Sequence, residues 1–531
     1  MAESSFRRRL LLQDHNTFTV DTSVYLTFVA LENDLTVTFS NELQYFINGN
    51  EDWDTLPANT ESPSINAGQT ISFKANIVPV KNNGANNGVG RFRVSKKFEA
   101  IGDPRSLSHG DVMEEIIHGD LGISDYQFYN LFGSCGELIK VSKNFLPSTK
   151  LANHCYSHMF DSCDGLTTTP ELPATTLTEW CYESMFSGCT SLTIAPELPA
   201  TTLANYCYFY MFRYCTSLTI APELPVTELA DYCYDSMFST CYGLTTAPEL
   251  PATTLAEGCY ESMFSWCDRL KSVPELNFIE VGYGSCRRMF EGCSNLEIIP
   301  MELPAVHNIG YAYEGMFRYC DSMEISPAIN NITIDGIFGS YNACQYMFEY
   351  CTNLKEIYLK GSTYATTDQF DSWVSGVSPT GKFYKLPSVS FPTGESGIPE
   401  GWEIVDSTWT APDRFRRGVG VSKCKEWVID YESSSYLEVS AELDYGFTVI
   451  RFHFNDVTSA TFEIETNSAE GELLIGDKNR VCTPDQFAEV VNNSGTITVN
   501  SERGSFVEFC LTRTYTDGII KTATIKIINL D

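Results

Sequence analysis

His154 and His158 have the spacing of a metal-binding pair on a helix, where side chains four residues apart share one face. The same two positions in the following repeats of the chain hold Trp180 with Ser184, and then Tyr206 with Tyr210. A ligand pair is not expected at positions that change so freely. We therefore interpret the two histidines as surface side chains and predict no metal there.

The letters of a Ser-His-Asp triad occur twice, as "SHGD" at residues 108–111 and as "HGD" at residues 118–120. Neither segment has a nucleophile motif such as G-x-S-x-G, and the chain has no Walker loop or dinucleotide-binding fingerprint. A glycan depolymerase would need two paired carboxylates in a cleft, and no such pair stands out. The sequence therefore predicts turns at both segments, no enzyme and no cofactor.

One glutamate recurs in each copy of the motif "PELP". If the copies stack in register, the carboxylates form a row in which strand-like neighbours lie about 5 Å apart. Such a row has the oxygen ligands that Ca²⁺ prefers, although a solvated acidic edge that limits association is the favoured interpretation. The row consists of Glu171, Glu197, Glu223, Glu249 and Glu275.

The charge balance restricts the partners. The 531 residues include 35 Lys and Arg against 68 Asp and Glu, a formal net charge of −33. This balance argues against nucleic acid and anionic membrane, because phosphate binding needs clustered cations. The one basic cluster, Arg7, Arg8 and Arg9, precedes an apolar run too short for a secretion signal. No stretch approaches the roughly twenty apolar residues of a membrane span, so we expect a soluble protein made in a cytoplasm.

An internal repeat dominates the middle of the chain. The block Met-Phe-x-x-Cys-x-x-Leu, or a near copy, recurs every 26 residues from Phe160 to Phe290, with spacings of 28 before and 27 and 31 after that stretch. This spacing predicts a solenoid of nine turns with irregular ends. The phenylalanines of the block are Phe132, Phe160, Phe186, Phe212, Phe238, Phe264, Phe290, Phe317 and Phe348.

Each repeat is predicted to form one helix and one short strand. Cys207, Met211 and Cys215 follow one another at intervals of four residues, as on one face of a helix. Leu218 and Ile220 then alternate with polar residues, as in a strand. On a helix, two cysteines eight residues apart are separated by about 12 Å, beyond the reach of a disulfide or a shared zinc. We therefore interpret the cysteines of the repeats as small, reduced, buried side chains.

The positions that vary between repeats are predicted to face solvent. Two residues after each Cys-Tyr and two after each Met-Phe change, whereas the Cys, Tyr, Met, Phe, Leu and Pro framework stays constant. The constant residues would make the core, and the variable columns would form a stripe on a rigid rod. Exposed aromatic side chains suit sugar or protein surfaces, so the candidate binding residues are Phe209, Tyr210, Arg213, Tyr214 and Trp266.

The segment "LPATTLTEWCYESMFSGCTSLTIAPELPATTLANYCYFYMF" resembles the BspA-like leucine-rich-repeat proteins of gut Bacteroidales and of their bacteriophages, including the crAss-like phage virion type. Residues 25–75 are similar to the β-rich segment that precedes such arrays, and "FDSWVSGVSPTGKFYK" and "SGIPEGWEI" are similar to their closing cap. The resemblance extends over about residues 20–405. It implies a non-enzymatic leucine-rich-repeat solenoid used for adhesion or binding, and it names no ligand.

The predicted fold is multidomain, with a central leucine-rich-repeat α/β solenoid between two β-sandwiches. Its parts are a basic tail at 1–15, a β-sandwich at 16–101, the solenoid with its C-terminal cap at 102–405, and an immunoglobulin-like β domain at 406–531. The last domain rests on six alternating segments: "YLEVSAEL", "FTVIRFHF", "ATFEIET", "GTITVN", "SFVEFCLTRTY" and "TATIKIINL".

The absence of a recognisable export signal, together with an adhesin-like scaffold, favours a bacteriophage virion protein of the tail, fibre or capsid surface. Its expected partners are other virion proteins, a glycan or protein of the host surface, and further copies of itself in a symmetric particle. In that setting Arg7, Arg8 and Arg9 are candidates for docking onto another virion protein. The alternative is a Bacteroidales cell-surface adhesin.

Overall fold

The computed structural model describes residues 22–48, 52–79, 88–109, 123–273, 278–297, 309–333, 343–362 and 367–406, with 276, 299, 302–303, 306–307 and 364, and eight strands after residue 435. The chain forms two compact units, residues 1–297 with 302–408, and residues 409–531 with 298–301. In these described parts, no helix has the length and hydropathy needed to cross a bilayer.

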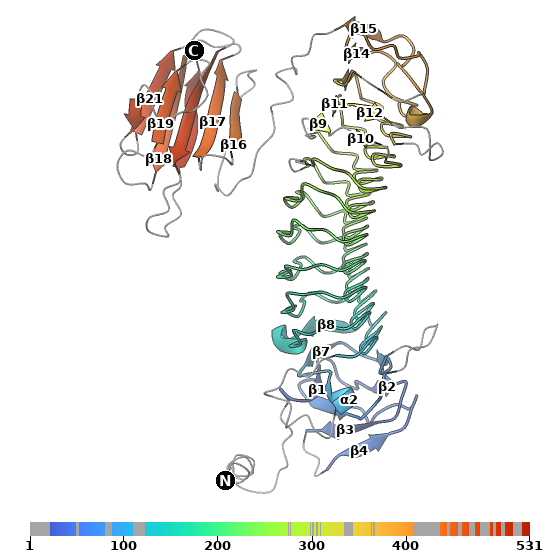
Figure 1. Ribbon diagram of the computed structural model, residues 1–531. Coiled ribbons are helices and arrows are strands. Elements are labelled where there is room, and N and C mark those ends of the chain that lie inside the picture. Colours follow the sequence, from blue (N-terminus) through green and yellow to red (C-terminus); the bar gives the residue numbers. More distant parts are fainter. Residues whose placement is uncertain are drawn as a thin grey trace. The chain divides into compact units, whose positions relative to one another are not determined.

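The first unit begins with a six-stranded sheet whose last strand belongs to the repeats (Figure 1). The strand order is β4-β3-β5-β1-β7-β8, and only β7 and β8 pair in parallel. The strands are β1 (Leu26–Ala30), β3 (Leu43–Ile47), β4 (Asp54–Leu56), β5 (Thr70–Lys74), β7 (Phe98–Ile101) and β8 (Leu138–Val141), and a second sheet pairs β2 (Val37–Phe39) with β6 (Phe92–Val94). The predicted strand-rich character of this region is confirmed, whereas a sandwich stays a prediction.

A cluster of phenylalanine rings joins these strands to the first repeat. The ring of Phe28 lies 4.9 Å from that of Phe73, 4.6 Å from that of Phe98 and 5.8 Å from that of Phe132 in the first repeat, measured between centroids. All four side chains are fully buried. The N-terminal strands and the short helix α2 (Ser106–His109) therefore close one end of the solenoid, whose apolar interior would otherwise meet water.

The repeats form stacked coils of tandem turns, and the predicted helix of each repeat is wrong. In one coil, Phe209, Met211 and Arg213 donate their backbone N–H groups to carbonyls three residues earlier. The residues between them donate to the next coil instead: Tyr208 N–H to Cys233, Tyr210 N–H to Asp235 and Phe212 N–H to Met237, at 2.9–3.1 Å. Alternate N–H groups thus close turns within the coil, and the others bond to the next coil, so every N–H from Tyr206 to Cys215 has a partner.

The backbone angles show why this coil cannot be a helix. Every fourth residue has a left-handed conformation, as at Tyr206 (φ 58°), Tyr210 (φ 58°) and Tyr214 (φ 61°). A left-handed residue costs an L-amino acid about 1–2 kcal/mol and interrupts a right-handed helix. The hydrogen bonds between coils offset that cost. Because the turn pattern repeats every four residues, it buries Cys207, Met211 and Cys215 on one side just as a helix would.

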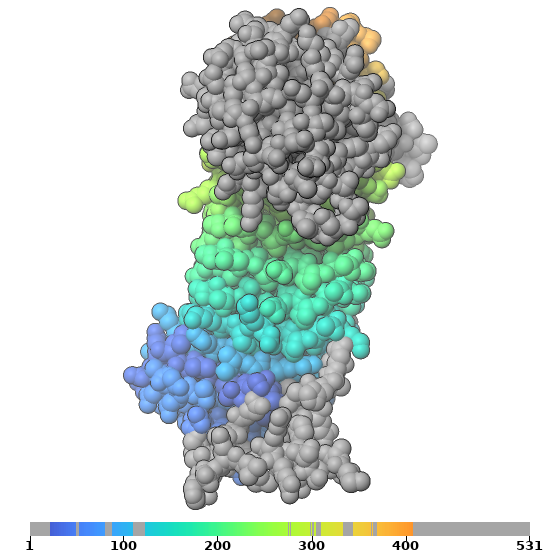
Figure 2. Space-filling model, turned by 90° about the vertical axis from the view of Figure 1, so that its left-hand side faces the viewer, coloured from blue at the N-terminus to red at the C-terminus, as the bar shows by residue number. Residues whose placement is uncertain are grey.

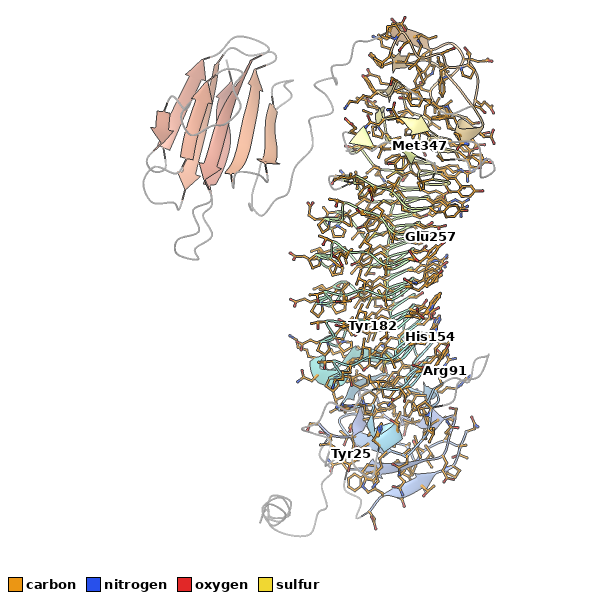
Figure 3. All side chains as sticks on the ribbon, in the orientation of Figure 1. Tyr25, Arg91, His154, Tyr182, Glu257 and Met347 are labelled. Carbon is orange, nitrogen blue, oxygen red and sulfur yellow. The ribbon has the colours of Figure 1, made fainter. Side chains whose placement is uncertain are left out.

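Ladders of identical side chains fill the interior of the stack. Phe212, Phe238 and Phe264 have ring centroids 5.7 Å apart and planes within 8° of parallel, and all are fully buried. A second ladder contains the rings of Tyr182 and Tyr208, with centroids 5.8 Å apart. Figure 3 places Tyr182 inside the stack and His154 and Glu257 at its margin. The predicted core of constant residues is therefore confirmed in these coils.

The cysteines of the repeats are buried and free, as predicted. The separation predicted for two cysteines of one repeat does not apply, because it assumed that both lie on a helix. The thiols of the later cysteine column donate to the carbonyl of the preceding coil, for example Cys215 Sγ to Phe186 O and Cys241 Sγ to Phe212 O, both 3.1 Å. Cys286 and Cys344 occupy the position of the ladder tyrosines and not that of the cysteine that precedes each of these tyrosines. The backbone bonds show this, because Tyr260 N–H bonds to Ser285 and Tyr313 N–H bonds to Ala343, where Tyr208 N–H bonds to Cys233. Burial raises the pKa of thiols such as Cys207 and Cys241 to about 12.

We expect the native repeats to resist thiol reagents. In a variant with Cys424, Cys482 and Cys510 replaced by Ala, titration of the folded protein at pH 8 should label almost none of the sixteen repeat cysteines. After unfolding in guanidinium, all sixteen should react. Rapid labelling of several thiols in the folded protein would contradict the buried columns.

The last coils end in a parallel sheet and an aromatic cap. The sheet has the order β15-β14-β13-β11-β9 and consists of β9 (Glu302–Leu303), β11 (Ile325–Ile329), β13 (Glu356–Leu359), β14 (Lys382–Lys385) and β15 (Glu403–Asp406), beside a pair of β10 (Val306–His307) and β12 (Ile332–Thr333). Trp373 Nε1 donates to Gly397 O and Trp402 Nε1 to Ser378 O, at 2.9 and 2.8 Å. Both indoles belong to the segments predicted to close the array, and they seal its interior.

The second unit contains two antiparallel sheets, ordered β16-β17-β22-β19-β20 and β21-β18-β23. All six predicted strands are present, as β16 (Tyr436–Glu442), β17 (Phe447–Phe454), β18 (Ser459–Thr466), β21 (Gly495–Asn500), β22 (Ser505–Thr512) and β23 (Ala523–Leu530). The sequence did not predict β19 (Leu473–Asp477) and β20 (Glu489–Val491). An immunoglobulin-like packing of the two sheets stays a prediction.

Candidate binding face

The variable positions are the two residues after each Cys-Tyr and the two after each Met-Phe. They line one side of the coils, which we call the variable face. Its most exposed aromatic side chains among the described residues are Tyr214, Trp266 and Tyr350, which are 43%, 44% and 43% exposed. The prediction that the whole face is open to solvent is wrong, because Asp235, Ser236 and Ser239 are buried. Small side chains in one coil are covered by larger ones that lean over from the neighbouring coil.

Glycines show this covering most clearly. A Cβ atom added to Gly292 would lie 2.6 Å from two indole atoms of Trp266, and one added to Gly258 would lie 2.2 Å from the ring of Tyr232. Each ring thus lies directly over a glycine one coil further along. Both glycines have positive φ, at 74° and 55°, so they provide the left-handed turn as well as the space.

Gly258→Ala is expected to destabilise the protein more than Gly284→Ala. Both glycines have nearly the same φ, 55° and 60°, in the same column of adjacent coils. A Cβ at Gly284 would meet only a carboxylate oxygen of Glu261 at 3.9 Å, so its substitution should cost about 1 kcal/mol from backbone strain. Gly258→Ala should carry the same strain and a further loss of about 1–2 kcal/mol of stability, because the Tyr232 ring must move to make room for the Cβ. Urea unfolding measures both, and equal losses would contradict the covering ring.

A continuous stack of rings runs beside the variable face, and sequence reasoning missed it. Centroid distances are 5.6 Å from His154 to Trp180, 3.9 Å from Trp180 to Tyr206 and 4.9 Å from Tyr206 to Tyr232, with planes within 10° of parallel. The signal was present, since the residue before the first Cys of four successive repeats is His or an aromatic residue. Because the rings cover each other's faces, mainly their edges remain for other contacts.

Four of the five predicted binding residues come from one coil and lie together. The Arg213 guanidinium lies 4.6 Å from the ring centroids of both Tyr210 and Tyr214, and it donates to the Tyr214 hydroxyl at 3.1 Å. The ring of Phe209 lies 3.8 Å from that of Tyr210 and packs edge-on against Trp180 at 5.6 Å. We call Phe209, Tyr210, Arg213 and Tyr214 the aromatic–arginine cluster.

Trp266 is not part of this cluster. It lies two coils further along, and its ring is 5.8 Å from that of Tyr319. The coils beyond it carry a network of charges in the same columns. Arg287 pairs with Glu261 at 3.2 Å and with Glu314 at 2.8 Å, and further pairs join Arg288 to Glu314 and Arg318 to Glu291 and Glu349.

His154 and His158 are partly buried and lie on the tandem turns, with no helix between them. Glu183 of the next coil contacts both, at 3.4 Å from His154 Nδ1 and 3.6 Å from His158 Nε2, and Asp161 lies 3.1 Å from His158 Nδ1. Burial lowers the pKa of His158, but its bonds to Asp161 and Glu183 outweigh this and raise it to about 9. Burial raises the pKa of Glu183, but the hydrogen bonds and charges of both histidines outweigh this and lower it to about 2. A charged His158 with a carboxylate at each nitrogen offers a metal no lone pair.

Asp235→Asn is expected to stabilise the protein at alkaline pH. Burial, assisted by Glu261, raises the pKa of Asp235 from 3.8 to about 7, while Ser236, Arg213 and Arg287 oppose the shift. The folded state therefore holds a proton that the unfolded state loses, and wild-type stability falls as pH rises from 3.8 through 7.

Since asparagine has no proton to lose, the variant should gain about 1–3 kcal/mol at pH 8 and almost nothing near pH 3.5. Urea unfolding of both proteins at the two pH values provides the measurement. A gain that does not depend on pH would show that Asp235 titrates normally.

The other predicted sites receive no support from geometry. Glu171, Glu197, Glu223 and Glu249 are exposed, and within the described ranges no three His, Cys, Asp or Glu side chains lie close enough to hold a metal ion. Glu275, His118, Arg7, Arg8 and Arg9 lie outside the described residues. His109 is in α2, where Ser108 Oγ lies 3.0 Å from its Nδ1.

A stack of coils with a constant core and a variable outer side defines a solenoid repeat protein. Residues 123–373 contain a BspA type leucine rich repeat region, matched by a six-copy family model over 123–245, 197–324 and 261–373. The resemblance noted in the sequence is therefore correct for the repeats. Neither the curated proteins nor the solved structures include a significant match.

Proposed function

We propose that the protein is a non-enzymatic binding scaffold carried by a bacteriophage particle, as a tail, fibre or capsid-surface component, for host attachment or particle decoration. The observation that carries the binding role is the contrast between an invariant interior and a variable face with half-exposed aromatic rings. A stack held by backbone bonds between all coils keeps that face rigid, so little conformational entropy is lost on binding.

The placement on a phage particle rests on the sequence resemblance alone, and a Bacteroidales cell-surface adhesin is the alternative. The deciding experiment is mass spectrometry of gradient-purified particles beside washed cell envelopes from the culture that makes the protein. Stoichiometric peptides in the particles support the virion role. Peptides confined to the envelopes overturn it in favour of the adhesin.

The binding role has a separate test. Tyr214→Ala with Trp266→Ala removes two of the three most exposed rings of the variable face, and binding of the full chain to host cells should fall at least tenfold. The matched control is Ile194→Ala with Ile220→Ala, since these side chains are 69% and 66% exposed and lie outside the variable face, in a parallel bridge between adjacent coils. Figure 2 shows the successive coils as adjacent bands of colour. Equal binding by wild type and the ring variant would refute a role for this face.

A further inference from the structure

We propose that the aromatic–arginine cluster binds a carboxylate-bearing sugar, an inference that rests on the proposed binding function and specifies its ligand. The starting observation is a difference between arginines in the same columns of the variable face. Arg287, Arg288 and Arg318 each pair with glutamates of neighbouring coils. Arg213 has aromatic rings as neighbours instead.

In the part of the chain that the structure describes, no carboxylate pairs with Arg213. Its column neighbours one coil away are Ser187 and Ser239, which carry no charge. Asp235 lies near enough to influence Arg213 electrostatically, but its carboxylate accepts a hydrogen bond from Ser236 Oγ at 2.7 Å. The Nε of Arg213 is buried without a hydrogen-bond partner among the described residues. Because Nε is buried, an incoming anion would meet the terminal nitrogens, of which Nη2 donates one of its two N–H groups to the Tyr214 hydroxyl. The guanidinium thus keeps terminal N–H donors for that anion.

The orientation of Arg213 is fixed before a ligand arrives. Tyr210 and Tyr214 hold the guanidinium at 4.6 Å from each ring, and the Tyr214 hydroxyl accepts a bond from one terminal nitrogen. A fixed guanidinium presents paired N–H groups that match the two oxygens of a carboxylate. The half-exposed Tyr214 ring beside it offers an apolar surface for the C–H groups of a sugar ring.

The backbone of this coil favours a sugar over a peptide. Extended peptides usually bind by adding a strand to a free sheet edge, with main-chain hydrogen bonds. Here the N–H groups from Tyr206 to Cys215 are all used, alternately within the coil and to the next coil. A peptide would therefore find no main-chain donors along this stretch, whereas a sugar acid needs only the guanidinium and a ring.

The test compares acidic sugars with uncharged counterparts. Trigalacturonic acid and its trimethyl ester, and sialyllactose and lactose, are titrated into the full chain at 0.15 M NaCl and followed by saturation-transfer NMR. At least one acid should bind at least tenfold more tightly than its uncharged counterpart. Arg213→Gln should abolish that difference, and Arg213→Lys, which keeps the charge but loses the fork, should retain part of it. Arg269→Gln, at an exposed arginine off this face, should change nothing.

Thermal unfolding of each variant verifies that it folds. If Arg213→Gln does not fold, the comparison of Arg213→Lys with wild type still tests the inference. Three results overturn the inference: equal binding of acid and neutral sugar, an acid preference that survives Arg213→Gln, or tighter binding of pentaglutamate than of either sugar acid. In each case the proposed function stands as long as the Tyr214 and Trp266 variant loses binding to cells. If that variant binds cells as wild type does, the proposed function itself fails.

Discussion

Phe238→Ala is expected to lower the free energy of unfolding by about 3–5 kcal/mol, the usual cost of emptying a large aromatic site in a core. The ring of Phe238 is fully buried between those of Phe212 and Phe264, with both centroids at 5.7 Å. Backbone bonds from Phe212 to Met237 and from Phe238 to Met263 fix the coils on both sides to the coil of Phe238, so they cannot collapse into the cavity. Urea unfolding followed by circular dichroism gives the measurement.

Phe209→Ala is the matched control, since it removes the same side chain from the partly exposed variable face. It should cost about 1 kcal/mol, in proportion to the smaller area that it buries. Because each coil contacts only its neighbours, Phe238→Ala could also divide the unfolding of the stack into two steps. A loss below about 1 kcal/mol in a single step would show that the ladder tolerates a gap and would contradict the packing.

Insertion of one glycine between Asp235 and Ser236 is expected to abolish folding of the coils around it. The inserted residue changes which N–H groups close turns and which reach the next coil. The bonds from Ser236 to Glu261, Phe238 to Met263 and Thr240 to Ser265, at 2.7–2.9 Å, would all lose their register. Each is worth about 1 kcal/mol, and the buried ring of Phe238 would turn toward solvent as well, for a total above about 4 kcal/mol.

The control is the same insertion between Thr246 and Ala247, in the extended part of that repeat. Among the described residues, the alternating hydrogen bonds within and between coils do not extend to this point, and Thr246 is exposed. The loss there should stay within about 1–2 kcal/mol, as for a lengthened loop. Limited proteolysis and circular dichroism compare the two proteins. Equal tolerance of both insertions would mean that the alternating bonds do not define the coil.

The repeat pattern alone is enough to predict which residues are buried in the repeats and how often the coil recurs. The spacing of 26 residues gave the register of the stack, and the constant Tyr, Met, Phe and Cys columns are the observed interior. These features are local and repeated, so a pattern is enough to reveal them. The six later strands could be predicted from local apolar–polar alternation, and the closing segments from the resemblance to the repeat family.

The backbone conformation and the contacts across coils depend on residues far apart in the sequence, so they become visible only in the folded protein. A spacing of four residues between Cys207 and Met211 fits both a helix and tandem turns, and only the bonds to the next coil distinguish them. The left-handed residues are stable because those distant partners exist. In the same way, Arg213 has no carboxylate partner among the described residues, and Trp266 covers Gly292, because of the side chains that the neighbouring coils place beside them. The sequence around each residue does not show which side chains those are.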